Sequence, residues 1–381
     1  MSSDPFVMGS IMDLTLYLQE MADADASDLF ITVGMAVSAK INGQLTPIGS
    51  EKLAQESALA LVHDAMSDKQ KIEFEDSKEC NFAIAREGIG RFRCSAFWQR
   101  DMPGMVIRRI ITEIPQASDL GLPEILKEVI MAKRGLVLFV GATGTGKSTS
   151  LAALIGHRNR HSKGHILTIE DPIEFVHQHD NCVVTQREVG IDTKSFDDAL
   201  KSSLRQAPDI ILIGEIRSME TMEYAMSFAD TGHLCVATLH ANNANQAIER
   251  IMHLAPPEQH GKLRFDLSLN MRAIIAQQLV PTIDGKGRIA AIEILLNSPL
   301  VTDLIRRNET GGLKEAMRKG KELGMQSFDM ALYELFQQGK ISLEQAIHHA
   351  DSPNDLRLMI KLDSDQGNSL GSLADVSIDM D

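Results

Sequence analysis

The eight residues from Gly141 to Ser148 carry the clearest chemistry in this sequence. They read GATGTGKS, the pattern G-x-x-x-x-G-K-[ST], in which backbone N–H groups of a glycine-rich loop cradle phosphates. The stretch follows a continuous apolar run, GLVLFVG, and opens a helical one, KSTSLAALIGHRN. Because a helix N-terminus aims its dipole and its unpaired N–H groups at an anion, this context predicts a phosphate loop. A glycine-rich turn with a chance lysine is the alternative.

Two ligands are predicted from this loop, ATP and Mg²⁺. We expect Lys147 to contact the β- and γ-phosphates and the Ser148 hydroxyl to hold Mg²⁺. The predicted nucleotide-binding residues of the loop are Gly141, Ala142, Thr143, Gly144, Thr145, Gly146, Lys147, Ser148 and Thr149.

Hydrolysis also needs a carboxylate close to the terminal phosphate. The apolar run DIILIGEIR ends in Gly214-Glu215, which predicts Glu215 as the general base or as the residue that positions the attacking water. A glutamate at the solvent end of a strand is the alternative. TIEDPIEF places Glu170, Asp171 and Glu174 after another buried strand, and ligands of open α/β sheets bind beyond the carboxyl ends of strands.

An acidic group in that crevice can bind Mg²⁺ or its waters. The predicted metal ligands are Ser148, Glu170 and Glu215, and an ordinary acidic loop is the alternative for Glu170 and its neighbours.

Histidines lie at both ends of the run HLCVATLH. As a strand, this run separates His233 from His240 by ~23 Å, so the two cannot share a metal. His240, at the carboxyl end, is predicted to hydrogen-bond phosphate or Glu215, with an exposed loop histidine as the alternative.

Five arginines stand in the first 110 residues: Arg91, Arg93, Arg100, Arg108 and Arg109. Alternation puts Arg91 and Arg93 on one strand face. Such arginines can reach a nucleotide as fingers, in the same chain or from a neighbouring subunit, and a solvated hairpin face is the alternative.

The composition excludes several classes of protein. The net charge of −14 over 381 residues argues against an electrostatic nucleic-acid binder. Four scattered cysteines without a C-x-x-C pair argue against a disulfide framework. We find neither a signal peptide nor a run of 18 apolar residues, so we expect a cytoplasmic protein without a membrane span.

The hydrophobic pattern divides the chain into four parts. Residues 1–113 read as a small α+β domain, with one hairpin at Asn42-Gly43 and another turning near Pro103-Gly104. The segment 114–123 reads as a linker. From 124 to 362, strands alternate with helices, which predicts a doubly wound α/β domain followed by helices at its C-terminal end. The acidic, serine-rich stretch 363–381 is predicted to be a disordered tail.

Taken together, GATGTGKST, ILTIEDPIEF, TQREVG, LRQAPDIILIGEIR and TGHLCVATLHANNA resemble the motif set of the type II/type IV secretion ATPases. The resemblance covers about residues 12 to 362 and is strongest to the pilus retraction branch, the PilT/PilU group. HANNANQA and SPNDLRLMIKL resemble PilU in particular. The family resemblance implies a PAS-like N-terminal domain, a RecA-like P-loop ATPase domain and a ring hexamer with ATP between the domains.

The resemblance also assigns roles to single residues. The catalytic residues that it and the pattern imply are Glu215, Glu174, His240, Arg93 and Arg108. His233 and Arg217 join Lys147 and the rest of the loop in nucleotide binding. Two departures stand out: Ser218 replaces the aspartate that often follows Arg217, and LIRR at 304–307 replaces the retraction motif of PilT.

These features predict an ATP-hydrolysing hexameric motor for type IV pilus retraction and twitching motility, working with a PilT-type partner on an inner-membrane platform protein. The motor would lie in the cytoplasm, docked at the inner face of the inner membrane. A traffic ATPase for DNA or protein export, and a nucleotide-sensing adaptor with little turnover, are the alternatives.

Overall fold

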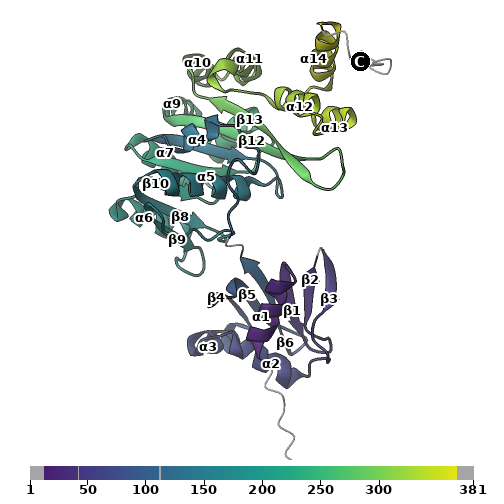
Figure 1. Ribbon diagram of the computed structural model, residues 1–381. Helices are drawn as coiled ribbons and strands as arrows, with labels where there is room; N and C mark the ends of the chain where they lie inside the picture. The colour runs from purple at the N-terminus through teal and green to yellow at the C-terminus, as the bar shows by residue number, and fades with distance from the viewer. Residues whose placement is uncertain (1–12, 42, 111–112, 367–381) are drawn as a thin grey trace, which may run out of the picture. The chain divides into compact units, whose positions relative to one another are not determined.

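The computed structural model describes residues 13–41, 43–110 and 113–366, and these divide into two compact units (Figure 1). One unit contains the described residues up to 113 together with 174–176, and the other contains 114–173 and 177 onward. The predicted linker 114–123 therefore groups with the second unit. Ala117 and Leu122 are buried in the core of that unit, so this segment is packed chain rather than a free tether.

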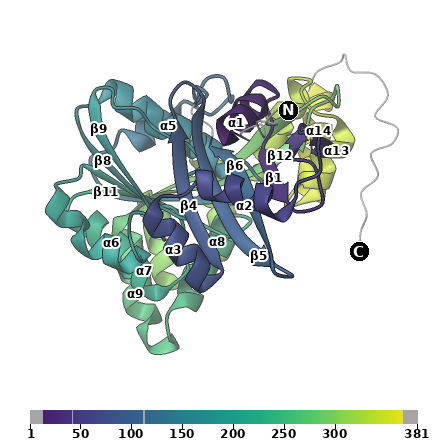
Figure 2. The ribbon, with the colours of Figure 1, turned by 90° about the horizontal axis from the view of Figure 1, so that it is seen from below.

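The first unit is an antiparallel sheet of six strands in the order β3-β2-β1-β6-β5-β4, with three helices (Figure 2). Its strands are β1 Asp28–Thr32, β2 Ser38–Ile41, β3 Gln44–Pro47, β4 Glu79–Arg86, β5 Gly90–Gln99 and β6 Met102–Ile110. Its helices are α1 Leu14–Asp23, α2 Gln55–Asp64 and α3 Asp68–Ser77. Helix α2 lies against β1 and β6, and α3 against β4. All three helices share one core with alternate sheet residues such as Leu29, Ile31, Phe92 and Cys94. This is the small α+β unit that the pattern predicts.

The second hairpin of this unit turns three residues earlier than expected. Arg100 and Asp101 form its turn, with φ values of 49° and 59°, whereas Pro103 and Gly104 lie inside β6. Two successive positive φ values match the right-handed twist of the flanking strands, which explains why the turn forms there. Pro103 pairs with Trp98 within the ladder, so the prediction of a turn at Pro103-Gly104 is wrong.

The second unit is built on a seven-stranded sheet in the order β13-β12-β7-β11-β10-β8-β9. All neighbours are parallel except the antiparallel pair β12 and β13. Its strands are β7 Gly135–Val140, β8 Gly164–Glu170, β9 Cys182–Glu188, β10 Ile210–Ile213, β11 Leu234–Leu239, β12 Met271–Pro281 and β13 Arg288–Leu296. The mostly parallel α/β sheet is confirmed. Strands β9 and β12 were not expected. Strand β9 is an edge strand with exposed positions, and β12 begins directly after the last residue of α9.

Helices cover both faces of this sheet. They are α4 Ile125–Ile130, α5 Lys147–His161, α6 Phe196–Ser203, α7 Met219–Asp230, α8 Ala244–Leu254, α9 His260–Asn270, α10 Pro299–Arg307, α11 Leu313–Lys319, α12 Phe328–Gln337, α13 Leu343–His349 and α14 Pro353–Gln366. Strand β7 shows the layering: Val137 and Phe139 pack with α4 and α5, while Leu136, Leu138 and Val140 pack in the opposite core. Helix α14 continues past Leu362 to Gln366, so the chain is helical where the tail was expected to begin. Residues 367–381 of that expected tail lie outside the described residues.

Candidate nucleotide site

The predicted phosphate loop connects β7 to α5, in the strand-to-helix context that binds phosphate. Lys147 Nζ donates to the carbonyl oxygens of Gly141 and Ala142, at 2.7 Å each. The Thr145 hydroxyl also donates to the Ala142 oxygen, at 2.9 Å. The lysine is therefore folded over the loop whose N–H groups it is expected to assist.

The phosphate loop is also held by Gln277 of β12, a residue that the sequence did not single out. Its Nε2 donates to the Thr145 oxygen at 2.9 Å, and its side chain is almost completely buried. A Cβ on Gly141 would lie 2.6 Å from the Gln277 carbonyl oxygen, and one on Gly146 would lie 2.9 Å from Gln277 Nε2. Both glycines also have positive φ values, 155° and 83°. The loop is thus shaped so that only glycine fits where the backbone must curl, as a phosphate cradle requires.

The functional residues gather at the carboxyl ends of neighbouring strands. Val140, just before the loop, pairs with Leu239, and His240 follows Leu239. Ile213 pairs with Ile169, so Gly214-Glu215 and Glu170 also lie just beyond this edge. The structure brings the loop, Glu215, His240 and Glu170 to one edge of one sheet.

Glu215 is the centre of a charged cluster. Its Oε1 lies 3.1 Å from His240 Nε2, and its Oε2 accepts from Arg217 Nε at 2.7 Å. The second arm of Arg217 reaches Asp171 Oδ2 at 3.5 Å. Glu215 is largely buried, while Arg217 and His240 are about half exposed. Each carboxylate oxygen can accept more than one hydrogen bond, so both contacts leave Glu215 able to bind a water.

The acidic side chains predicted for Mg²⁺ differ in their surroundings. Glu170 Oε1 accepts from the Thr168 hydroxyl at 2.6 Å and from Gln186 Nε2 at 3.1 Å, so its carboxylate is held in place. Ser148 is the second residue of α5. Hydroxyl and carboxylate oxygens are the donors that Mg²⁺ prefers, so the set Ser148, Glu170 and Glu215 fits this ion chemically. Its role as a metal site stays a prediction.

His233 is not brought to this edge. It precedes Leu234, which pairs with Gly135 at the other end of β7, roughly 16 Å of strand from the phosphate loop. Its Nδ1 lies 3.1 Å from the Thr231 hydroxyl at the end of α7. His233 therefore lies at the amino end of β11, away from the phosphate loop of its own chain, and its part in nucleotide binding stays a prediction.

The predicted arginine fingers lie in the first unit. Arg93 and Arg108 stand directly opposite each other on β5 and β6. Arg108 Nε donates to Asp28 Oδ1 at 2.8 Å. Burial raises the pKa of Asp28, but the hydrogen bonds from Arg108 and Ser27 outweigh it and hold that pKa below its ordinary value. Glu174 is exposed on the loop after β8. The finger roles of the arginines and the catalytic role of Glu174 stay predictions.

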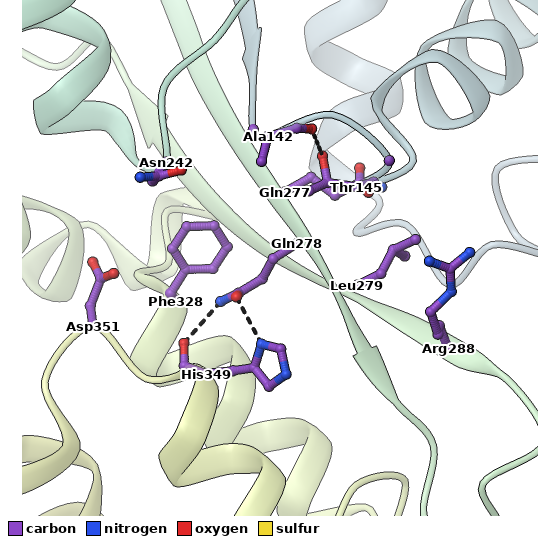
Figure 3. A pocket seen from close by; sticks show the side chains of 12 residues that line it. Ala142, Thr145, Asn242, Gln277, Gln278, Leu279, Arg288, Phe328, His349 and Asp351 are labelled. Atoms are coloured by element: carbon purple, nitrogen blue, oxygen red, sulfur yellow. Dashed lines mark hydrogen bonds between the residues drawn. The ribbon is translucent and has the colours of Figure 1, made fainter.

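A pocket of about 330 Å³ opens beside the phosphate loop (Figure 3). Loop residues Gly141, Ala142, Gly144 and Thr145 line it, together with Asn242, Gln277, Gln278, Leu279, Arg288, Phe328, His349 and Asp351. Gln278 Nε2 donates to the His349 carbonyl oxygen at 3.1 Å, so its Oε1 is left to accept from His349 Nδ1, also at 3.1 Å. Burial and the neighbouring His348 lower the pKa of His349, which keeps its imidazole neutral. The C-terminal helices thus complete a polar pocket that sequence patterns did not predict.

One sequence departure has a structural explanation. Ser218, in place of the expected aspartate, is the N-cap of α7, and its hydroxyl accepts from the Thr221 N–H at 3.2 Å. Serine and aspartate cap helices about equally well. The replacement therefore preserves the local structure beside Arg217.

A phosphate loop on a mostly parallel sheet, with an acidic residue beyond a neighbouring strand, defines a RecA-like P-loop nucleotide-binding protein. The family described as Type II/IV secretion system protein matches residues 9–350. The type IV pilus ATPase PilU of Pseudomonas aeruginosa is 60% identical over 354 residues, which cover 93% of each chain. The chain belongs to this secretion family of P-loop ATPases, in the group that contains PilT and PilU.

Two further comparisons agree with that assignment. The type IV pilus retraction ATPase PilT of the same organism is 42% identical over 90% of this chain and 99% of its own. The crystal structure of the pilus retraction motor PilT with bound ADP superposes with a TM-score of 0.83 at 38% identity, covering 91% of this chain and 99% of the other. None of the described helices is long and apolar enough to cross a membrane.

Proposed function

We propose that this chain is a Mg-dependent ATPase that powers type IV pilus retraction, and so twitching motility. The observation that carries the enzymatic part is Glu215, held between His240 and Arg217 at the sheet edge that bears the phosphate loop. The printed functions of its relatives, a pilus ATPase and a pilus retraction motor, support the biological part.

Each residue of the nucleotide site has its own role in ATP hydrolysis. The loop N–H groups and Lys147 hold the phosphates, and the pocket beside the loop gives room for the rest of the nucleotide. Glu215 orients the attacking water and accepts its proton, while His240 holds the carboxylate in place and senses the terminal phosphate. Mg²⁺, held by Ser148 with Glu170 or Glu215, would neutralise the charge that develops on the phosphates.

The working form is a ring hexamer whose arginines, Arg93 and Arg108, complete the site. The two arginines stand directly opposite each other on β5 and β6, so they present two guanidinium groups side by side. Guanidinium groups bind phosphate oxygens through paired N–H donors, which supports the finger role. ATP drives a conformational change only by binding one state better than the other, and contact between these arginines and the γ-phosphate supplies that difference.

The load is a pilus, pulled through an inner-membrane platform protein against which the cytoplasmic ring docks. A PilT-type motor works beside it, since the retraction motif of PilT is replaced here by LIRR at 304–307. In the structure this segment ends α10, and Arg306 Nε donates to the Ser268 hydroxyl at 3.0 Å.

Turnover of Mg-ATP by the purified chain, measured against its own concentration, tests the proposal. Turnover per subunit should rise with concentration as rings form, and Glu215→Gln should lower kcat by about 10²–10⁴-fold, the range for loss of a general base. Glu223→Gln, on helix α7, is the control and should match the wild-type chain. Binding of ATP without turnover at any concentration would contradict an autonomous enzyme and favour an adaptor or a partner-dependent motor.

A further inference from the structure

A buried carboxylate lies close to the site without belonging to it. Glu293 is on β13, paired with Ala276 of β12, which in turn pairs with Val140 at the start of the phosphate loop. Only 1% of Glu293 is exposed. Its Oε1 accepts from the Ala244 N–H at 2.8 Å, whereas its Oε2 has no hydrogen-bond partner among the described residues. An ionisable group this deeply buried is costly to the fold and calls for a functional reason.

The contact with Ala244 ties Glu293 to the loop that carries His240. Ala244 is the first residue of α8, only four residues beyond His240, and the Asn243 side chain caps the helix by accepting from the Gln246 N–H at 3.0 Å. A carboxylate at a helix N-terminus is favoured by the helix dipole. Glu293 therefore fixes one end of the 240–244 loop, and His240 at the other end contacts Glu215.

The C-terminal helices hold the same loop from the other side. Asn243 Nδ2 donates to Asp351 Oδ2 at 3.3 Å, and Lys314 of α11 lies 3.2 Å from that oxygen. Asp329 of α12, itself buried, accepts from the Asp351 and Ser352 N–H groups at 2.9 Å and 3.2 Å. Figure 3 shows Asp351 and Phe328 lining the pocket together with Asn242 of this loop.

We propose that Glu293 is a positioning residue for ATP hydrolysis, which together with Asp351 couples the C-terminal helices to the loop that places His240 against Glu215. The inference rests on the proposed ATPase function. Through this anchor, a load or partner that shifts the C-terminal helices alters the contact between His240 and Glu215 without touching the nucleotide.

The ionised form of Glu293 is the one that anchors the loop, because a charged acceptor strengthens the bond from the Ala244 N–H. Burial raises the pKa of Glu293 to about 7, and the negative charge of Asp351 also raises it. The backbone N–H groups of Ala244 and Phe328 and the charge of Lys314 lower the pKa, but by less. The charged groups that act on it are thus Asp351 from the loop after α13 and Lys314 from α11. Asp329 of α12 contacts these two groups in turn. The first turn of α8 and the paired strand contribute Asn243, Ala244 and Ala276, which do not titrate.

The test compares Glu293→Gln with the wild-type full-length chain in steady-state ATP hydrolysis from pH 6 to 8. We expect kcat at pH 8 to fall about tenfold with little change in KM, because misplacing a catalytic group slows the chemical step without removing phosphate contacts. Wild-type kcat should also rise with pH through about 7, and that step should be absent in Glu293→Gln. Glu315→Gln, an exposed glutamate on α11, is the matched control.

A second variant separates the anchor from the helix cap. Asn243→Ser keeps a good N-cap but removes the amide that reaches Asp351, so it should lower kcat in the same direction. If wild-type turnover is present while Glu293→Gln keeps the wild-type kcat and pH profile, the positioning role is wrong although the ATPase stands. If the wild-type chain itself does not turn over ATP, it is the proposed function that fails.

Discussion

At the scale of single residues, Glu215 and His240 could be predicted because strand periodicity shows which residues follow a strand's carboxyl end. Periodicity also placed His233 at the opposite end of that strand, as the structure has it, whereas its predicted nucleotide role came only from the family resemblance. Gln277 and Glu293 could not be predicted. Each is a polar residue inside a buried strand, and only the tertiary neighbours, the phosphate loop and Ala244, show what it supports.

The buried charge of Glu293 makes a prediction about stability. Its pKa is about 7 in the folded chain against an ordinary 4.5, so the folded state binds this proton more tightly than the unfolded state. The stabilising contribution of this proton is fully present below about pH 4.5 and is lost as the pH rises through 7. At pH 8 the carboxylate should therefore cost about 3 kcal/mol, and Glu293→Gln should raise the free energy of unfolding of the second unit.

Chemical denaturation of the wild-type chain and Glu293→Gln at pH 8 and pH 5 measures this. The gain from the substitution should shrink towards pH 5, where both side chains are neutral. A variant that is stabler at pH 8 and yet slower would show that the carboxylate is kept for function at the expense of stability. A variant that is less stable at pH 8 would instead make Glu293 a structural residue.

At the scale of elements, the sequence pattern located most helices and strands. It misplaced a turn and missed a strand whose positions depend on packing against other elements. Asn42-Gly43 predicted the first hairpin, and β2 and β3 flank it, with Asn42 outside the described residues. The second hairpin turns at Arg100-Asp101 rather than at Pro103-Gly104, and the register of β5 and β6 pairs Gln99 with Met102 across that turn. Buried strands such as β7 were recognisable from continuous apolar runs, while β12, interrupted by Gln277 and Gln278, was not.

The cap of α7 tests whether residue 218 is structural. Ser218→Ala removes the hydroxyl that accepts from the Thr221 N–H and should cost about 1 kcal/mol of stability. Ser218→Asp restores a capping acceptor, so stability and ATP turnover should both stay at the wild-type level. Thermal unfolding and steady-state hydrolysis measured on the two variants give the answer. A change in kcat for Ser218→Asp, without a change in stability, would mean that the family's aspartate acts on the reaction itself.

At the scale of the whole molecule, the sequence predicted two kinds of architecture because its periodicity changes once, near residue 114. The exact boundary between the two units depends on packing. Two apolar residues, Ala117 and Leu122, do not form a recognisable periodic pattern, yet both are buried in the core of the second unit. The C-terminal helices were expected at the end of the α/β domain, and none of their residues was predicted to line the site. The structure gives them part of the pocket, through Phe328, His349 and Asp351, which links their position to the nucleotide site.

If the working form is a ring with shared sites, two inactive variants should restore activity when they are mixed. Lys147 and Glu215 lie at one sheet edge of one unit, whereas Arg93 and Arg108 lie in the other unit. If the arginines reach the nucleotide of a neighbouring subunit, a Lys147→Ala chain can lend its arginines to a chain that lacks them. Equal mixtures of Lys147→Ala with the double variant Arg93→Ala and Arg108→Ala should therefore recover part of the wild-type turnover. A mixture of Lys147→Ala with Glu215→Gln is the matched control and should recover none, because both defects fall in sites built by a single chain. Absence of recovery in both mixtures, with rings still forming, would place the arginines in the same chain as the phosphate loop that they serve.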